Sequence, residues 1–124
     1  MFRHHYWRIE IDETAVNHAR KKGLDEVRIW AVNRLDKRVS APSKALFRDG
    51  MQTPLHGRVV YYAQHATASC CRKCMEEWHG IDRNQFLTED QINYLTELIM
   101  LYIRGRLPTL SQHVETIPRP IPVG

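Results

Sequence analysis

The sequence predicts an α+β fold: a mainly helical small domain of about four helices, with a short strand or small sheet beside a cluster of cysteine and histidine. Apolar residues recur at helical spacing in several segments. One segment is continuously β-branched or aromatic, and all three cysteines of the 124-residue chain lie close together. We expect one domain over residues 1–107, followed by a Pro-rich, flexible tail over 108–124.

Two helices are expected in the first third of the chain. Asp12 can cap a helix that Gly23 would end, and Asp25 can cap a second helix that runs to about Ser40. Apolar residues of the second helix recur every three or four positions. Residues 41–57 then form a long connection with two prolines and two glycines, and a connection of this length is typically functional or mobile.

The next segments predict a strand and then a helix. Residues 59–63, Val-Val-Tyr-Tyr-Ala, have the β-branched and aromatic composition of a strand. This strand would deliver His65 to a turn. A helix is expected from about Thr67 or Ser69 to His79.

The last predicted helix has the clearest signals. Thr88 and Gln91 are spaced as a capping box, which marks a helix start. Apolar residues continue at helical spacing to Ile103, and Pro108 follows the end. This segment therefore predicts an amphipathic helix that packs on the core.

The cysteines form the candidate chemical centre. Cys71 and Cys74 make a C-x-x-C pair with a histidine on each side, and zinc selects thiolate and imidazole ligands. Residues three apart on a helix share a face, whereas Cys70 would lie about 100° around the helix from Cys71. Cys70 would replace Cys71 if the helix began later. The predicted zinc ligands are His65, Cys71, Cys74 and His79.

Other interpretations of the cysteines remain open. A C-x-x-C at a helix N-terminus after a strand is also how thioredoxin-like proteins arrange redox thiols, although that fold needs more strands than this sequence predicts. Reduced cysteines can also be small core residues. A catalytic zinc would keep one position open for water. The protein would then be a metal-dependent nuclease or hydrolase using His65 as base or ligand.

Basic residues are concentrated ahead of the cysteines. Residues 1–58 carry 12 Lys/Arg against 7 Asp/Glu, a net charge of +5, and residues 59–124 carry 6 against 7, a net charge of −1. A basic face is typical of nucleic-acid binding, and the alternative is a solvated surface. Expected phosphate contacts are Lys37, Arg38, Lys44, Arg48 and Arg58.

The chain shows no sign of a membrane or secretory destination. No segment approaches the roughly 18 consecutive apolar residues of a membrane span, and the first residues lack an apolar signal core. An odd number of cysteines in one cluster fits a reducing compartment. We therefore expect a cytoplasmic protein without a membrane partner.

Four stretches carry a resemblance to a known family. They are Gln52-Thr53-Pro54-Leu55-His56-Gly57, Ala63-Gln64-His65-Ala66-Thr67-Ala68, Cys70-Cys71-Arg72-x-Cys74 and Trp78-His79-Gly80-Ile81. With Leu87-Thr88-Glu89 and the Leu98-Ile99-Met100 helix, they resemble the bacterial domain-of-unknown-function family 4186. The resemblance covers about residues 12–106 and is most specific over 51–82. Residue 56 is His where the family has Arg as often.

The resemblance implies a shared domain with a shared His/Cys centre, and it implies no established activity. Small proteins of this kind would suit phage, mobile-element or defence biology. The sequence therefore favours a small zinc-binding, nucleic-acid-associated module. The alternatives are the nuclease or hydrolase above, and a protein-binding module in which the metal is purely structural.

Overall fold

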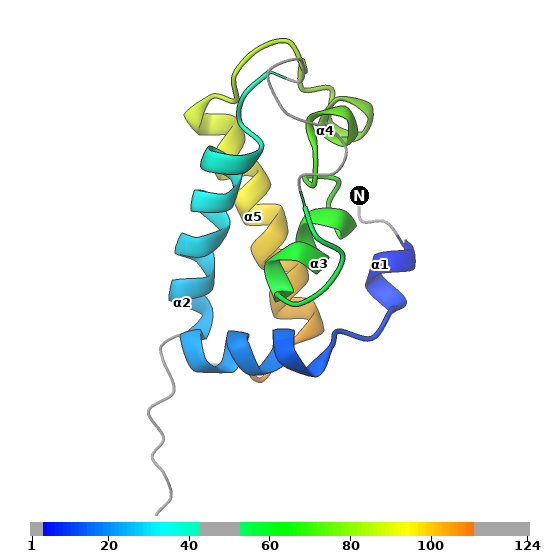
Figure 1. The fold of residues 1–124 in the computed structure, drawn as a ribbon, viewed down its shortest axis with the longest axis vertical. Helices are drawn as coiled ribbons and strands as arrows, with labels where there is room; N and C mark the ends of the chain where they lie inside the picture. The colour runs from blue at the N-terminus through cyan, green and yellow to red at the C-terminus, as the bar shows by residue number, and fades with distance from the viewer. Residues whose placement is uncertain (1–3, 43–52, 111–124) are drawn as a thin grey trace, which may run out of the picture.

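The fold is built from helices, as a computed structural model that describes residues 4–42 and 53–110 shows (Figure 1). The helices are α1 (His4–Arg8), α2 (Glu13–Arg38), α3 (Val59–Ala66), α4 (Arg72–His79) and α5 (Glu89–Arg106). Within the described residues there is no strand, so the predicted α+β class with its short strand or sheet is wrong. None of these helices is long and apolar enough to cross a membrane.

The segment predicted as a strand forms most of α3. Every residue of α3 except Tyr61 is buried, because the helix lies in the middle of the fold against α1, α2 and α5. Its first five residues, Val59 to Ala63, are apolar or aromatic without a polar position between them, so they do not mark one face of a helix. A short apolar run of this kind does not distinguish helix from strand by pattern alone.

Helix α2 bends at Gly23. Its two arms correspond to the two helices that were predicted separately. Gly23 has non-helical dihedral angles, φ 78° and ψ 165°, and the chain changes direction there. Figure 1 shows the first arm of α2 crossing the base of the molecule and the second arm rising beside α5. The predicted cap at Asp12 is confirmed, because its carboxylate accepts a hydrogen bond of 3.0 Å from the Ala15 amide.

Two further predicted helix ends are also confirmed. The Thr88 hydroxyl accepts from the Gln91 amide at 3.1 Å, and the Gln91 side chain accepts from the Thr88 amide at 2.9 Å. This capping box starts α5. Gly80 ends α4 in the left-handed conformation, with φ 67°.

The core lies where α2, α3 and α5 meet. Burial of apolar side chains from three helices supplies the main driving force for this packing. The buried residues include Ala31 and Leu35 of α2, Val60 and Ala63 of α3, and Ile99 and Ile103 of α5.

The end of α5 holds α1 in place. The Tyr102 hydroxyl donates to the Tyr6 carbonyl at 2.6 Å, and the Arg106 guanidinium donates to the same carbonyl at 2.8 Å. Arg106 also donates to the carbonyl of Ile9. The Trp7 ring meets the Tyr102 ring edge-on, with 5.2 Å between centroids. The two ends of the described chain therefore close on each other.

Candidate functional site

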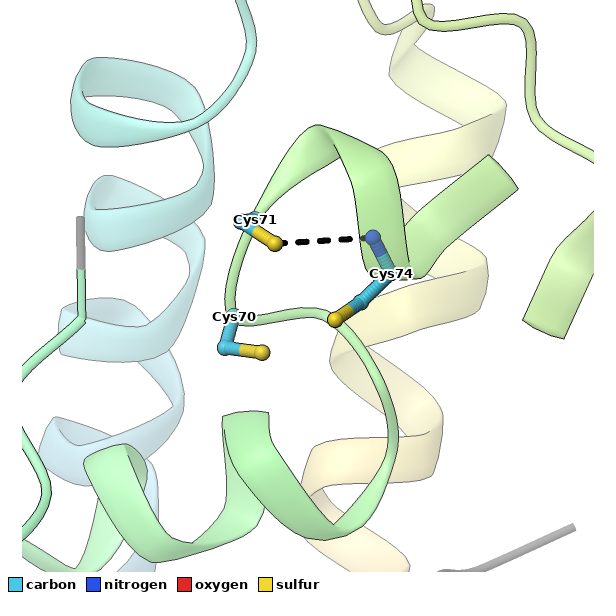
Figure 2. A group of neighbouring side chains, drawn as sticks. All are labelled: Cys70, Cys71 and Cys74. Atoms are coloured by element: carbon cyan, nitrogen blue, oxygen red, sulfur yellow. Dashed lines mark hydrogen bonds between the residues drawn. The ribbon is translucent and has the colours of Figure 1, made fainter. Parts of the chain in front are cut away.

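Three cysteine side chains converge on one point between α3 and α4. The Sγ atoms of Cys70, Cys71 and Cys74 all lie within 4.8 Å of one another, and Figure 2 shows the three sulfurs directed toward a common space. A zinc ion holds thiolates about 2.3 Å from itself, which places tetrahedral sulfurs about 3.8 Å apart. A small approach of the sulfurs would complete that geometry, so the cluster can hold a metal ion.

The start of α4 explains why Cys70 belongs to the group. Helix α4 begins at Arg72, later than predicted, and Cys71 is its extended N-cap, with φ −160° and ψ 165°. The Cys71 sulfur accepts a hydrogen bond of 3.4 Å from the Cys74 amide (Figure 2). Because Cys70 and Cys71 precede the helix, the 100° helical rotation that set Cys70 aside does not apply. The C-x-x-C pair thus stands at the entrance to a helix, where zinc sites commonly place it.

The turn that carries the cysteines is held by buried polar groups. The Ser69 amide donates to the Gln64 carbonyl at 2.8 Å, and the Gln64 side-chain amide donates to the Ser69 carbonyl at 3.1 Å. The Thr53 hydroxyl donates to the Cys70 carbonyl at 2.8 Å. Ala68 adopts a positive φ of 58°, uncommon for a residue with a side chain. These bonds fix the direction in which the first cysteine leaves the turn.

A buried arginine anchors the first turn of α4. The Arg72 side chain is fully buried. Its guanidinium donates to the carbonyls of Ser40, Ala41 and Gln85 through Nη1 and of Asp82 through Nη2, at 2.7–3.0 Å. Arg72 therefore joins the chain after α2, the loop after α4 and the cysteine turn. The sequence gives no sign of this role, because an arginine between cysteines usually reads as a solvated charge.

The two predicted histidine ligands are not part of the group of ligand atoms that the cysteines form. Among the described residues, the group of potential ligand atoms within 4.8 Å of one another holds only the three cysteines. His65 lies in the last turn of α3 and His79 ends α4. The predicted set of His65, Cys71, Cys74 and His79 therefore stays a prediction. The nuclease alternative assumed that His65 follows a strand, whereas it belongs to a helix.

Both histidines donate hydrogen bonds to backbone carbonyls. His65 Nε2 lies 3.2 Å from the Thr53 carbonyl and 3.0 Å from the Pro54 carbonyl. His79 Nε2 lies 2.6 Å from the Thr67 carbonyl. Since a carbonyl only accepts, Nε2 carries the proton in each ring and Nδ1 is the acceptor of the neutral form. The Nδ1 atom of His79 lies 3.1 Å from the hydroxyl of Tyr94.

Close contact and burial favour the protonated thiol at Cys70 and at Cys71. Hydrogen bonding with Cys71 and Cys74, together with burial, raises the pKa of Cys70. The hydrogen bond with Cys70 lowers the pKa of Cys71, but that with Cys74 and burial outweigh it, so this pKa is raised as well. A bound cation would have to displace these protons, which makes metal binding by the cluster pH-dependent.

A second feature lies on the face formed by α2 and the start of α3. A pocket of about 160 Å³, called here the Trp30 pocket, lies between the two helices. A more open depression of about 250 Å³, called here the Tyr61 hollow, adjoins it. The Trp30 pocket is lined by His18, Lys22, Glu26, Val27, Trp30, Arg58, Val59 and Val60. The Tyr61 hollow is lined by Trp30, Asn33, Arg34, Lys37, Arg38 and Tyr61. Because both share Trp30, we call them together the basic groove.

The basic groove collects three of the five predicted phosphate contacts. Lys37 and Arg38 line the Tyr61 hollow, and Arg58 lines the Trp30 pocket. Lys44 and Arg48 lie outside the described residues. The sequence prediction missed other residues of the groove, although a four-residue spacing along α2 could have indicated them. That series comprises His18, Lys22, Glu26, Trp30 and Arg34, and it ends at Arg38, which was predicted.

Burial and neighbouring positive charges lower the pKa of two basic residues in the groove. Burial, and then the charges of Arg58 and Lys22, hold the pKa of His18 below its usual value. Burial also lowers the pKa of Arg34, which the charge of Arg38 lowers further. Like charges held together attract anions, so the groove has the electrostatic character expected of a phosphate-binding surface.

Comparison with known proteins identifies a family and no structural relative. The family model described as "Domain of unknown function (DUF4186)" matches residues 1–104. No solved structure matches the chain. The matched region contains the cysteine cluster and the basic groove, and it reaches nearly to the end of α5.

Proposed function

The chain belongs to the DUF4186 family, whose description assigns no activity, and from that premise we propose a small zinc-binding protein that associates with nucleic acid. The observation that carries the zinc proposal is the convergence of three sulfurs within 4.8 Å. Thiolate ligands select zinc over hard cations. An iron–sulfur cluster typically takes four cysteines, and this chain has only three.

His65 is the proposed fourth ligand. Its ring donates from Nε2 to two carbonyls, and a zinc-bound histidine usually donates its other ring N–H in this way. Nδ1 is then the atom that would turn toward the metal. The Nδ1 atom of His79 already faces the Tyr94 hydroxyl. Three cysteines and one histidine make a closed tetrahedral site, the type that stabilises small domains.

Metal content tests the zinc proposal. Protein purified without a histidine tag from zinc-supplemented medium should contain about one zinc per chain by elemental analysis. Serine substitution of Cys70, Cys71 or Cys74 should each abolish stoichiometric zinc, because each removes a thiolate. His65→Ala should also weaken zinc affinity, because it removes the proposed fourth ligand.

Two variants serve as controls. His79→Ala should keep its zinc, since His79 is not a proposed ligand. Lys73→Ser changes an exposed neighbour of the cluster and should keep its zinc as well. Full zinc content in Cys70→Ser, with loss in His79→Ala, would instead support the ligand set predicted from the sequence. Wild-type protein without zinc and with freely reactive thiols would overturn the proposal.

The nucleic-acid part of the proposal is supported by the basic groove. Lys37 and Arg38 share the Tyr61 hollow with Arg34, and Arg58 lies in the adjoining pocket. Binding should weaken with salt because phosphate contacts release counterions. The double variant Lys37→Gln with Arg38→Gln should reduce the slope of log affinity against log salt by about 1.5 to 2.

The control for this measurement is Lys73→Gln, which removes an exposed positive charge from α4. It should leave the salt slope unchanged. Affinity that does not respond to salt, or an equal loss in the control, would remove the basis for phosphate binding by the groove.

A further inference from the structure

The Trp30 pocket has the size and lining for one planar ring. Its volume is about 160 Å³, and an engineered cavity of about 150 Å³ in another protein binds benzene. Val27, Val59 and Val60 are buried side chains that form apolar walls, and the half-buried Trp30 indole forms another. A six-membered heterocycle such as a pyrimidine base would fit and would bury apolar area.

Polar groups at the same pocket suit a nucleotide better than a plain hydrocarbon. Lys22 and Arg58 bring positive charge, and His18 beside them is kept mainly neutral at pH 7 because its pKa is lowered. The exposed Glu26 carboxylate can accept a hydrogen bond from an amino or hydroxyl group. The pocket therefore offers apolar surface for a ring and cations for an attached phosphate.

The adjoining Tyr61 hollow continues this arrangement. The Trp30 and Tyr61 rings lie 5.5 Å apart between centroids, and the Arg34 guanidinium carbon lies 5.0 Å from the Tyr61 centroid and 6.0 Å from that of Trp30. Lys37 and Arg38 complete the lining. Aromatic rings and arginine planes interleaved with cations are the elements that bind unpaired bases and their backbone.

We propose that the basic groove binds single-stranded nucleic acid, with one unpaired base beside Trp30 in the Trp30 pocket and the neighbouring phosphates over Arg34, Lys37 and Arg38. This inference rests on the proposed association with nucleic acid and narrows it to strands with unpaired bases. A duplex keeps its bases stacked, and placing one in the pocket would cost the energy of unpairing and unstacking. Single strands should therefore bind more tightly than duplexes of the same sequence.

Fluorescence anisotropy with labelled oligonucleotides of about 12 nucleotides tests the inference, since single-strand sites span about 4 to 16 nucleotides. Single-stranded DNA, single-stranded RNA and duplex DNA are compared with the zinc-loaded full chain over a range of salt. Both single strands should bind at least about 10-fold more tightly than the duplex. Trp30→Ala should weaken single-strand binding by about 5- to 150-fold, the effect of losing one stacked base.

Matched control variants test whether a loss of binding is specific to the groove. Trp78→Ala removes an exposed tryptophan of α4 and should leave binding unchanged. Lys22→Gln should weaken binding several-fold, whereas Lys21→Gln should not, because both lysines are exposed on α2 and only Lys22 lines the pocket. If Trp30→Ala fails to fold by circular dichroism, the lysine pair and Trp30→Phe decide the question.

The outcomes distinguish this inference from the proposed function. If no oligonucleotide binds in a salt-dependent way, the nucleic-acid association fails and the inference fails with it. If the duplex binds as tightly as the single strands, the association survives and the single-strand inference is overturned. Equal losses in the Lys21 and Lys22 variants would also overturn it.

Discussion

Single polar side chains hold together parts of this chain that are distant in sequence. The Asp12 carboxylate accepts hydrogen bonds from the Ala15 amide at 3.0 Å, the Gly57 amide at 2.9 Å and the Tyr62 hydroxyl at 2.8 Å. One residue thus joins the start of α2, the segment before α3 and α3 itself. Arg72 has the same function at the opposite end of α3, where it fixes the cysteine turn.

The state of Asp12 should make stability depend on pH. Burial alone would raise the pKa of Asp12, but the hydrogen bonds from Gly57, Tyr62 and Ala15 outweigh it and hold the pKa below its usual value. The folded-state pKa is therefore the lower one. The stabilisation by Asp12 is present above the unfolded-state pKa and is lost as pH falls through the folded-state pKa. Asp12→Asn should lower the free energy of unfolding by about 1 kcal/mol at pH 7.

Urea unfolding between pH 7 and pH 3 measures this effect. The gap between wild type and Asp12→Asn should begin to narrow once pH falls below the unfolded-state pKa, and it closes only below the folded-state pKa, where the carboxyl group is protonated in both states. Asp36→Asn, an exposed acid of the same helix, is the control and should show little gap at any pH. A gap for Asp12→Asn that stays constant with pH would contradict the assignment.

Only part of the cysteine cluster could be predicted from the sequence. Thiol spacing correctly indicated a cysteine cluster that could hold a metal ion. Which cysteines face one another depends on whether α4 begins before or after Cys71, and burial of Arg72 helps to fix that boundary. Such burial comes from contacts with residues 40, 41, 82 and 85. Local spacing contains no information about those contacts.

At the scale of elements, the predictions succeeded where one face of a helix meets solvent. The start of α5 was predicted from Thr88 and Gln91, and Gly23 was predicted to end the first helix at the position where α2 bends. The prediction failed at α3, where Val59, Val60 and Tyr62 have high strand propensity but pack as a helix among α1, α2 and α5. Tertiary packing overrides a weak local preference when an element is fully enclosed.

The bend in α2 should depend on glycine. Gly23 has φ 78° and ψ 165°, a region that only glycine adopts readily. Gly23→Ala should therefore lower the free energy of unfolding by about 1 to 3 kcal/mol, measured by urea unfolding. It should also weaken binding to the basic groove, because His18 and Lys22 lie on one arm of α2 and Trp30 on the other.

Asn17→Ala is the control for this substitution, since Asn17 is exposed within the first arm of α2. There alanine should be neutral or slightly stabilising, because alanine has the higher helix propensity. Unchanged or increased stability in Gly23→Ala would show that α2 can straighten, and the bend would then not be a requirement of the fold.

At the scale of the whole molecule, α3 connects the two candidate sites. Val59 and Val60 at its N-terminal end line the Trp30 pocket, and His65 at its C-terminal end lies beside the cysteine turn. A helix of eight residues is about 12 Å long. A metal bound at the cysteine cluster would hold one end of the helix whose other end forms the groove. The uneven charge of the sequence predicted a basic face. The aromatic lining of that face combines side chains of α2 and α3, and no local sequence pattern shows that these two helices lie side by side.

The hydrogen bonds between α5 and α1 affect the order in which the helices can dock during protein synthesis. The bonds from Tyr102 and Arg106 to Tyr6 join residues 96 and 100 positions apart. Helix α1 is synthesised first and can meet α3 once residue 66 has been translated, yet its hydrogen-bond partners on α5 come only near the end of the described chain. Contacts of such long range must wait for the chain to close on itself. Docking of α1 on α5 is therefore a late step, and nascent chains that stop short of residue 102 lack the hydrogen bonds from Tyr102 and Arg106.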